Sequence, residues 1–79
     1  MSDNTRELTF GEKAVGITFN PGGNDLVNQI KSNYAITIDH INLCREKSDN
    51  PEMKRMYSIA ITELQTSQMW AVKAATWQY

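Results

Sequence analysis

Cysteine and histidine are almost absent from this sequence of 79 residues, which contains only Cys44 and His40. One cysteine cannot form a disulfide within the chain. A zinc site takes three or four protein ligands, so we expect no bound metal, and no residue pattern indicates another cofactor. A lone thiol without an apolar leader at the N-terminus is typical of a protein from a reducing cytoplasm.

The sequence also lacks an excess of positive charge and a long apolar run. Eight Lys and Arg stand against nine Asp and Glu, which gives a net charge of −1 and no basic field for general nucleic-acid binding. No apolar run approaches the roughly 20 residues that span a bilayer. We therefore expect neither DNA nor a membrane as a partner.

The chain is too short to bury a large core. A domain of this size buries only about 60% of the surface that its unfolded chain exposes. Natural chains this short usually add disulfides, a metal or self-association. Because the first two are excluded, we predict that residues 1–79 form a single domain that assembles into a symmetric homo-oligomer.

Glycine and proline are confined to a few places that divide the chain. All four glycines and one of the two prolines lie in residues 1–23, whereas residues 24–48 and 51–77 hold no glycine and only Pro51. Glycine and proline interrupt helices, so the long stretches without them predict helices. We predict an all-α fold: an antiparallel hairpin of helices 24–48 and 51–77, preceded by an N-terminal segment 1–23 that is a short helix or an extended chain.

Apolar spacing and end signals support both helices. In the first, side chains recur three and four residues apart on one stripe: Val27, Ile30, Tyr34, Ile38 and Ile41. Asn24 or Asp25 can cap its start. In the second, Asn50 is a suitable cap, and Pro51 fits the first helical position, where its missing N–H costs nothing.

The second helix has two faces that call for partners. One face consists of Tyr57, Ile61, Leu64, Gln68, Ala71 and Ala75. Another, about a quarter turn or more away, carries Ile59, Thr66, Trp70 and Trp77. One neighbouring helix covers one face, so the other needs the N-terminal segment or another subunit. The two tryptophans could instead stack a ligand base, although core or interface packing is the commoner role.

Residues that could perform catalysis do not form a convincing set. Asp39, His40 and Cys44 lie close together in the sequence, but no glycine-rich elbow adjoins the thiol to form an oxyanion hole. Packing explains Cys44 better, and a surface position explains His40. Glu63 is expected to be paired or solvated, and clustered carboxylates of a nuclease are lacking. We predict that the protein is not an enzyme.

Residues 17–23, "ITFNPGG", are the strongest candidate for a binding site. Free amides at a helix start, beside a turn with little side-chain bulk, can hold a phosphate. The ring of Phe19 can stack a nucleobase, which is worth about 1–3 kcal/mol. Lys31, about two turns into the helix, can reach back with its ammonium group. The same residues also suit a plain helix-capping turn, so both interpretations stay open. The candidate residues are Phe19, Asn20, Pro21, Gly22 and Lys31.

Three stretches resemble a known family. "FGEKAVGITFNPGG", then "IK" in the first helix, and "SIAITELQTSQMWAVKAATW" are similar to the small phage proteins that share the anti-CBASS/anti-Thoeris hairpin domain, from about Phe10 to Trp77. The resemblance implies phage-encoded oligomers, often hexamers, that act in the cytoplasm of the host bacterium. They sequester cyclic oligonucleotide or cyclic ADP-ribose signals of bacterial immunity without cleaving them.

The resemblance also implies roles for particular residues. In anti-CBASS members a cyclic dinucleotide such as 3′,3′-cGAMP lies between paired protomers, where an aromatic residue stacks on a base and a basic residue of the following helix meets a phosphate. Phe19 and Lys31 fall at these places, although many relatives have tyrosine at the first. Some hexameric members also bind cyclic trinucleotides at a three-fold site, for which Asn33 and Arg55 are the nearest matches.

Two other functions are compatible with the sequence. The protein could be a sponge for the cyclic ADP-ribose isomers of Thoeris immunity. It could also be a non-enzymatic helical hairpin that binds a host protein through its tryptophan face. The anti-CBASS type of sponge is the function that we favour.

Overall fold

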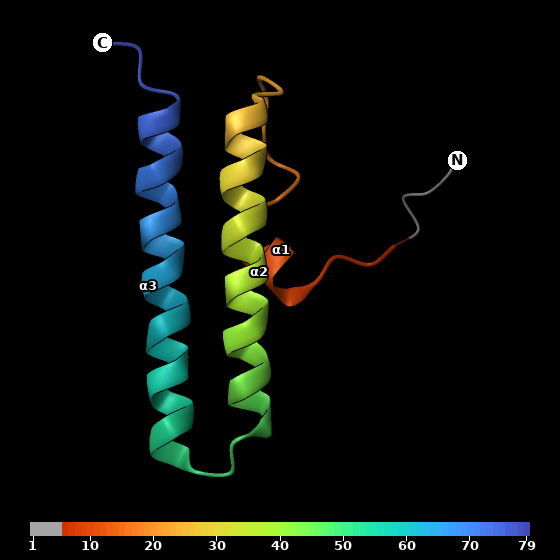
Figure 1. Ribbon diagram of the computed structural model, residues 1–79, viewed down its shortest axis with the longest axis vertical. Coiled ribbons are helices and arrows are strands. Elements are labelled where there is room, and N and C mark those ends of the chain that lie inside the picture. Colours follow the sequence, from red (N-terminus) through yellow and green to blue (C-terminus); the bar gives the residue numbers. More distant parts are fainter. Residues whose placement is uncertain (1–5) are drawn as a thin grey trace.

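A computed structural model describes residues 6–79, which form three helices (Figure 1). They are α1 (Phe10–Ala14), α2 (Asp25–Lys47) and α3 (Pro51–Ala75). The two long helices run antiparallel and side by side, and α1 packs on α2 (Figure 1). The predicted all-helical hairpin is confirmed, and residues 6–79 contain no strand. The second helix ends two residues before the predicted boundary at residue 77.

Side-chain caps determine where the long helices begin. The side chain of Asn24 accepts hydrogen bonds from the amides of Leu26 and Val27, and Asn50 does the same for the start of α3. Pro51 is the first residue of α3, as its spacing from the cap predicts. Each cap satisfies two amides that have no partner within the helix.

The N-terminal segment contains a short helix with its own capping box. Thr9 accepts a hydrogen bond from the amide of Glu12, whose carboxylate accepts one from the amide of Thr9. Hydrogen bonds from Arg6 and from the Thr9 backbone lower the pKa of Glu12. Gly16 follows the helix with φ of 62°, a left-handed conformation that suits glycine.

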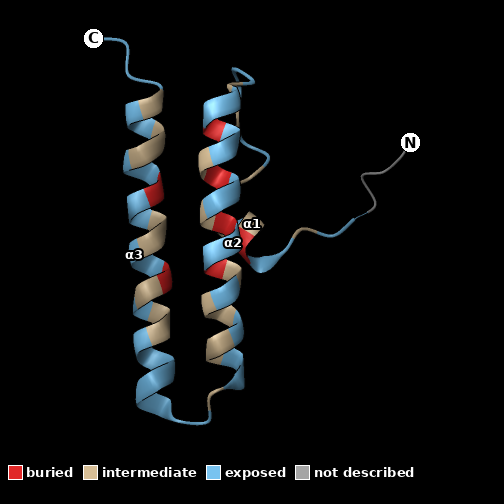
Figure 2. Cartoon of the chain, in the orientation of Figure 1, coloured by how far each residue is buried: buried red, intermediate tan, exposed pale blue. Residues whose placement is uncertain are grey.

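The core is a small cluster between the helices, built from Val15, Ala35, Ile38 and Ile61. Ile38 is fully buried, and the buried positions of α3 lie on the side that faces α2 (Figure 2). The predicted apolar stripe of α2 and the first face of α3 are buried or half-buried throughout. The periodicity therefore identified the correct packing faces.

The molecule is thin, so its outer faces stay uncovered. Its shortest extent is 13 Å, little more than the about 10–12 Å diameter of one helix. Trp70 and Trp77 are 65% and 58% exposed, which rules out a core role for them within one chain. No helix within residues 6–79 has the length and apolarity needed to cross a membrane.

Gly11 allows α1 to lie directly against α2. A Cβ atom at this position would stand 2.1 Å from the carbonyl oxygen of Ala35. The amide of Gly11 donates to the carboxylate of Asp39 over 2.6 Å. Asp39 therefore anchors the start of α1. This contact gives Asp39 a structural role.

We expect Gly11→Ala to lower the free energy of unfolding by about 1–3 kcal/mol, because the added methyl group meets backbone that cannot move alone. Urea unfolding followed by circular dichroism measures the change. Gly22→Ala is the matched control, since a Cβ there meets nothing within 4 Å. The control should stay within about 0.5 kcal/mol of the wild type. Equal stability of the two variants would contradict the tight contact of α1 with α2.

Candidate functional site

An open groove of about 640 Å³ lies between the turn that precedes α2 and the C-terminal end of α3. Five of the seven predicted site residues line it, namely Phe19, Asn20, Pro21, Gly22 and Lys31. The opposite wall comes from α3 and the residues after it, Val72, Ala75, Thr76, Trp77 and Gln78. The packing of α3 beside α2 therefore joins the two ends of the sequence in one site.

Lys31 is the electrostatic centre of the groove. It is only 4% exposed, and its ammonium group donates to the carbonyl oxygens of Gly16, over 2.9 Å, and Phe19. No carboxylate within residues 6–79 forms an ion pair with it. An ammonium group has three N–H donors, so one is left for another acceptor. A buried charge without a counter-charge is costly, and an anion in the groove would lower that cost.

Phe19 and Trp77 give the groove two exposed aromatic rings. Phe19 is 71% exposed, and its ring centroid lies 5.5 Å from the ammonium nitrogen of Lys31. Trp77 lies on the other wall and makes an edge-to-face contact with Tyr79, with 5.3 Å between ring centroids. Exposed aromatic rings beside a cation can stack planar ligands. The sequence drew attention to Trp77 without placing it in this groove.

The turn before α2 uses most of its polar groups internally. The side chain of Asn20 donates to the carbonyl of Asn24 and the side chain of Asn28, and it accepts from the amide of Asn24. The amide of Gly23 donates to the carbonyl of Asn20. In the first turn of α2, the amides of Leu26 and Val27 donate to the Asn24 side chain. The Asn24 cap therefore occupies the amides of Leu26 and Val27. The phosphate cradle at this helix start stays a prediction.

Pro21 and Gly22 form the exposed rim of the groove. Gly23 has φ of 61°, so its backbone conformation requires glycine. Gly22 has neither a positive φ nor a close neighbour. Nothing in the packing of the chain itself requires glycine at position 22.

Asn33 and Arg55 do not join this site within one chain. Asn33 is exposed on α2, and Arg55 lies near the start of α3, at the opposite end of that helix from the groove (Figure 1). Arg55 forms an exposed ion pair with Glu52 over 2.6 Å, and its hydrogen bond lowers the pKa of that carboxylate. If these two residues bind a ligand, other protomers must complete their site.

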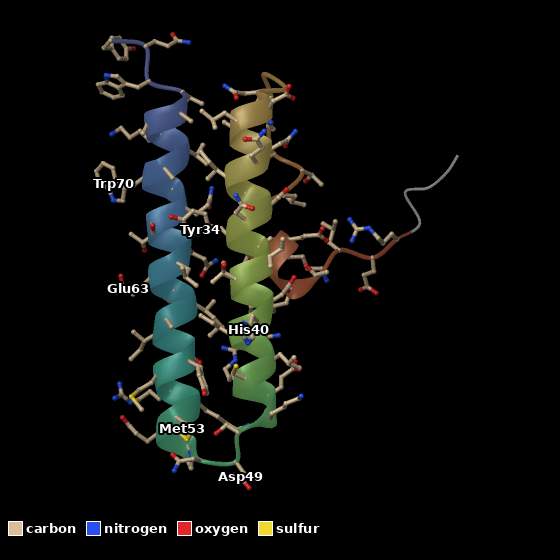
Figure 3. The ribbon with its side chains drawn as sticks, viewed as in Figure 1. Tyr34, His40, Asp49, Met53, Glu63 and Trp70 are labelled. Carbon is tan, nitrogen blue, oxygen red and sulfur yellow. The ribbon has the colours of Figure 1, made fainter. Side chains whose placement is uncertain are left out.

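The catalytic candidates do not gather into one cluster within the described residues. His40 is exposed on α2, whereas Glu63 lies on the edge of α3 that faces away from α2 (Figure 3). Cys44 is half-buried, and Glu63 makes no ion pair within residues 6–79, as expected for a solvated carboxylate. Across those residues no three His, Cys, Asp or Glu side chains gather into a possible metal site.

A helical hairpin with an uncompensated buried cation beside exposed aromatic rings has the features of a protein that binds an anionic, planar ligand. Residues 12–76 match the sequence model of the family described as Acb2/Tad1, hairpin domain. The match covers most of the chain, so the protein belongs to this family. Its members are anti-defence sponges that bind nucleotide immune signals rather than cleave them. Searches of curated proteins and of solved structures gave no match.

We expect Asn20→Ala to loosen the turn without unfolding the hairpin. The change removes three hydrogen bonds, each worth about 0.5–1.5 kcal/mol when formed within a protein. Hydrogen exchange should therefore accelerate at the amides of Gly23 and Asn24. Asn33→Ala, on the exposed surface of α2, is the control and should leave these rates unchanged. Unaltered exchange in Asn20→Ala would mean that the backbone alone holds the turn.

Proposed function

We propose that this protein is a phage sponge that binds cyclic dinucleotides such as 3′,3′-cGAMP in the groove beside Lys31 and keeps them from activating CBASS effectors. Family membership supports the general class, a sponge for nucleotide signals. The observation that carries the specific proposal is the buried ammonium group of Lys31, which lacks a counter-ion within residues 6–79 and adjoins the exposed ring of Phe19.

Lys31 and Phe19 have complementary tasks in this proposal. The remaining N–H of Lys31 donates to a phosphate oxygen, and a charge-assisted bond of this kind is roughly twice as strong as a neutral one. Phe19 stacks on a base. Phenylalanine lacks the hydroxyl group of the tyrosine found in many relatives, so it retains stacking and gives up one hydrogen bond. Pro21 and Gly22 leave the rim low enough for the ligand to enter, and Asn20 holds the turn in place.

The symmetry of the ligand calls for two protomers. A cyclic dinucleotide has two phosphates and two bases, whereas one chain offers one Lys31 and one Phe19. A two-fold contact between identical chains presents the same groups twice. We therefore propose one ligand for each pair of chains within a homo-oligomer, and the family resemblance favours a hexamer.

Binding without cleavage fits the lining of the groove. The residues that form it include no carboxylate, imidazole or thiol that could serve as a general base or a nucleophile. The protein would act by holding the signal stoichiometrically in the cytoplasm of the host bacterium.

Isothermal titration with 3′,3′-cGAMP tests the proposal. We expect one ligand per two chains, and chromatography should recover the ligand intact after heating. Phe19→Ala should weaken binding about 10- to 100-fold through lost stacking. Lys31→Ala should weaken it at least as much, because both the cation and the support of the turn are lost.

Control variants separate ligand contacts from folding. Phe19→Tyr keeps the stacking surface and should bind, and Lys54→Ala removes an exposed cation far from the groove and should also bind. Circular dichroism establishes that each variant is folded. Wild-type titration curves for both Phe19→Ala and Lys31→Ala would overturn the proposed site. Binding only to cyclic ADP-ribose isomers would identify a Thoeris sponge, and no response to any nucleotide would favour a hairpin that binds a host protein.

A separate trinucleotide site at Asn33 and Arg55 is the second part of the proposal. Arg55→Ala should lower affinity for a cyclic trinucleotide about tenfold or more and leave the affinity for 3′,3′-cGAMP unchanged. Competition titrations with both ligands measure the two effects. Lys54→Ala again serves as the control. Equal loss of both ligands in Arg55→Ala would mean that there is one site rather than two.

A further inference from the structure

The edge of α3 that faces away from α2 carries a regular row of exposed side chains. We call this row the outer seam, and it consists of Ile59, Glu63, Thr66, Trp70, Lys73 and Trp77. Successive members are alternately four and three residues apart, the spacing that lines up side chains in helix pairs. Glu63 and Trp70 lie on the same outer edge in Figure 3.

Trp77 belongs to the outer seam although it follows the end of α3. The ammonium nitrogen of Lys73 lies 5.2 Å from the ring centroid of Trp70 and 5.6 Å from that of Trp77. The two indole rings and Lys73 also line one shallow pocket with Ala74. The last turn therefore brings both tryptophans to the same edge.

The two charges of the outer seam have no ionic partner within residues 6–79. Neither Glu63 nor Lys73 forms an ion pair there, in contrast to Glu52 and Arg55 earlier in α3. An exposed row with a large apolar surface and two opposite, unpaired charges suggests an interface whose partner carries the complementary charges.

A second copy of α3 supplies the complement when it packs antiparallel. With a two-fold axis beside residue 68, Glu63 of each copy faces Lys73 of the other, and Trp70 faces Thr66. The same alignment sets Trp77 near Ile59, so that each large ring meets a smaller side chain. Every pair occurs twice, as a two-fold contact requires.

A parallel arrangement would have the opposite electrostatics. It would place the two Glu63 carboxylates opposite each other, and likewise the two Lys73 ammonium groups. Like charges that face each other across an interface cost several kcal/mol and exclude that alignment.

We propose that the outer seam is the contact through which two copies of this chain pack antiparallel along α3. This contact goes beyond the proposed ligand binding and rests on α3 and Trp77. It also has a consequence for the groove, because Trp77 lines the groove and belongs to the outer seam. Ile59 of the second copy would therefore support the wall of the groove opposite Phe19.

Charge reversal at the two seam positions tests the contact without any ligand. Glu63→Lys and Lys73→Glu each place like charges in both symmetric pairs. We expect each variant to self-associate roughly 100-fold more weakly and the mass of the assembly to fall to half or less. The double variant restores opposite charges and should recover the wild-type mass. Sedimentation equilibrium gives the masses, and circular dichroism establishes that the variants are folded.

Lys54→Glu is the matched control, because it reverses an exposed charge of α3 outside the outer seam. Its mass should equal that of the wild type. A wild-type mass for either single reversal would overturn the proposal, as would a monomeric wild type. Failure of the double variant to recover would overturn the antiparallel alignment. An assembled wild type that binds no nucleotide would instead contradict the proposed function and leave this contact standing.

Discussion

One buried ammonium group ties the N-terminal segment to the helical hairpin. Lys31 projects from α2, and its ammonium group donates to the carbonyl oxygens of Gly16 and Phe19. These two bonds fix the path of the backbone between Gly16 and Phe19. That course sets the Phe19 ring beside the groove and leads the turn into the cap of α2. The same group retains one donor and an unbalanced charge. The side chain that supports the N-terminal segment is therefore also the one that we propose to bind an anion.

The molecule is thin, and this feature links the proposed assembly to the proposed function. Three helices in a layer 13 Å thick bury one small cluster and leave the outer edge of α3 in water with two tryptophans. A chain of this length gains little from its own core, which is one reason why we propose contacts between copies. In the proposed function, a pair of chains would offer two Lys31 ammonium groups and two Phe19 rings to a two-fold ligand.

The stretch from Ile17 to Gly23 has fewer free polar groups than its composition suggests. The amides of Ile17, Phe19 and Gly23 and the side chain of Asn20 form hydrogen bonds within the chain. The left-handed conformation of Gly23 also shapes the turn. What remains for a ligand is the ring of Phe19, the low rim at Gly22 and the last donor of Lys31. In our proposal, the polar atoms of this stretch build the turn, and its exposed surface is left for the ligand.

Local chemistry in the sequence determined the helices, their caps and their packing faces, because capping and a 3.6-residue period depend on neighbours a few positions apart. It also singled out Phe19 and Lys31, and the resemblance named the family. Only the tertiary structure decided the contacts between distant positions. Gly11 meets Ala35, Asp39 anchors α1, and Trp77 closes the groove. The burial of Lys31 likewise depends on how the N-terminal segment crosses α2. These outcomes follow from packing geometry in three dimensions, which no local pattern encodes.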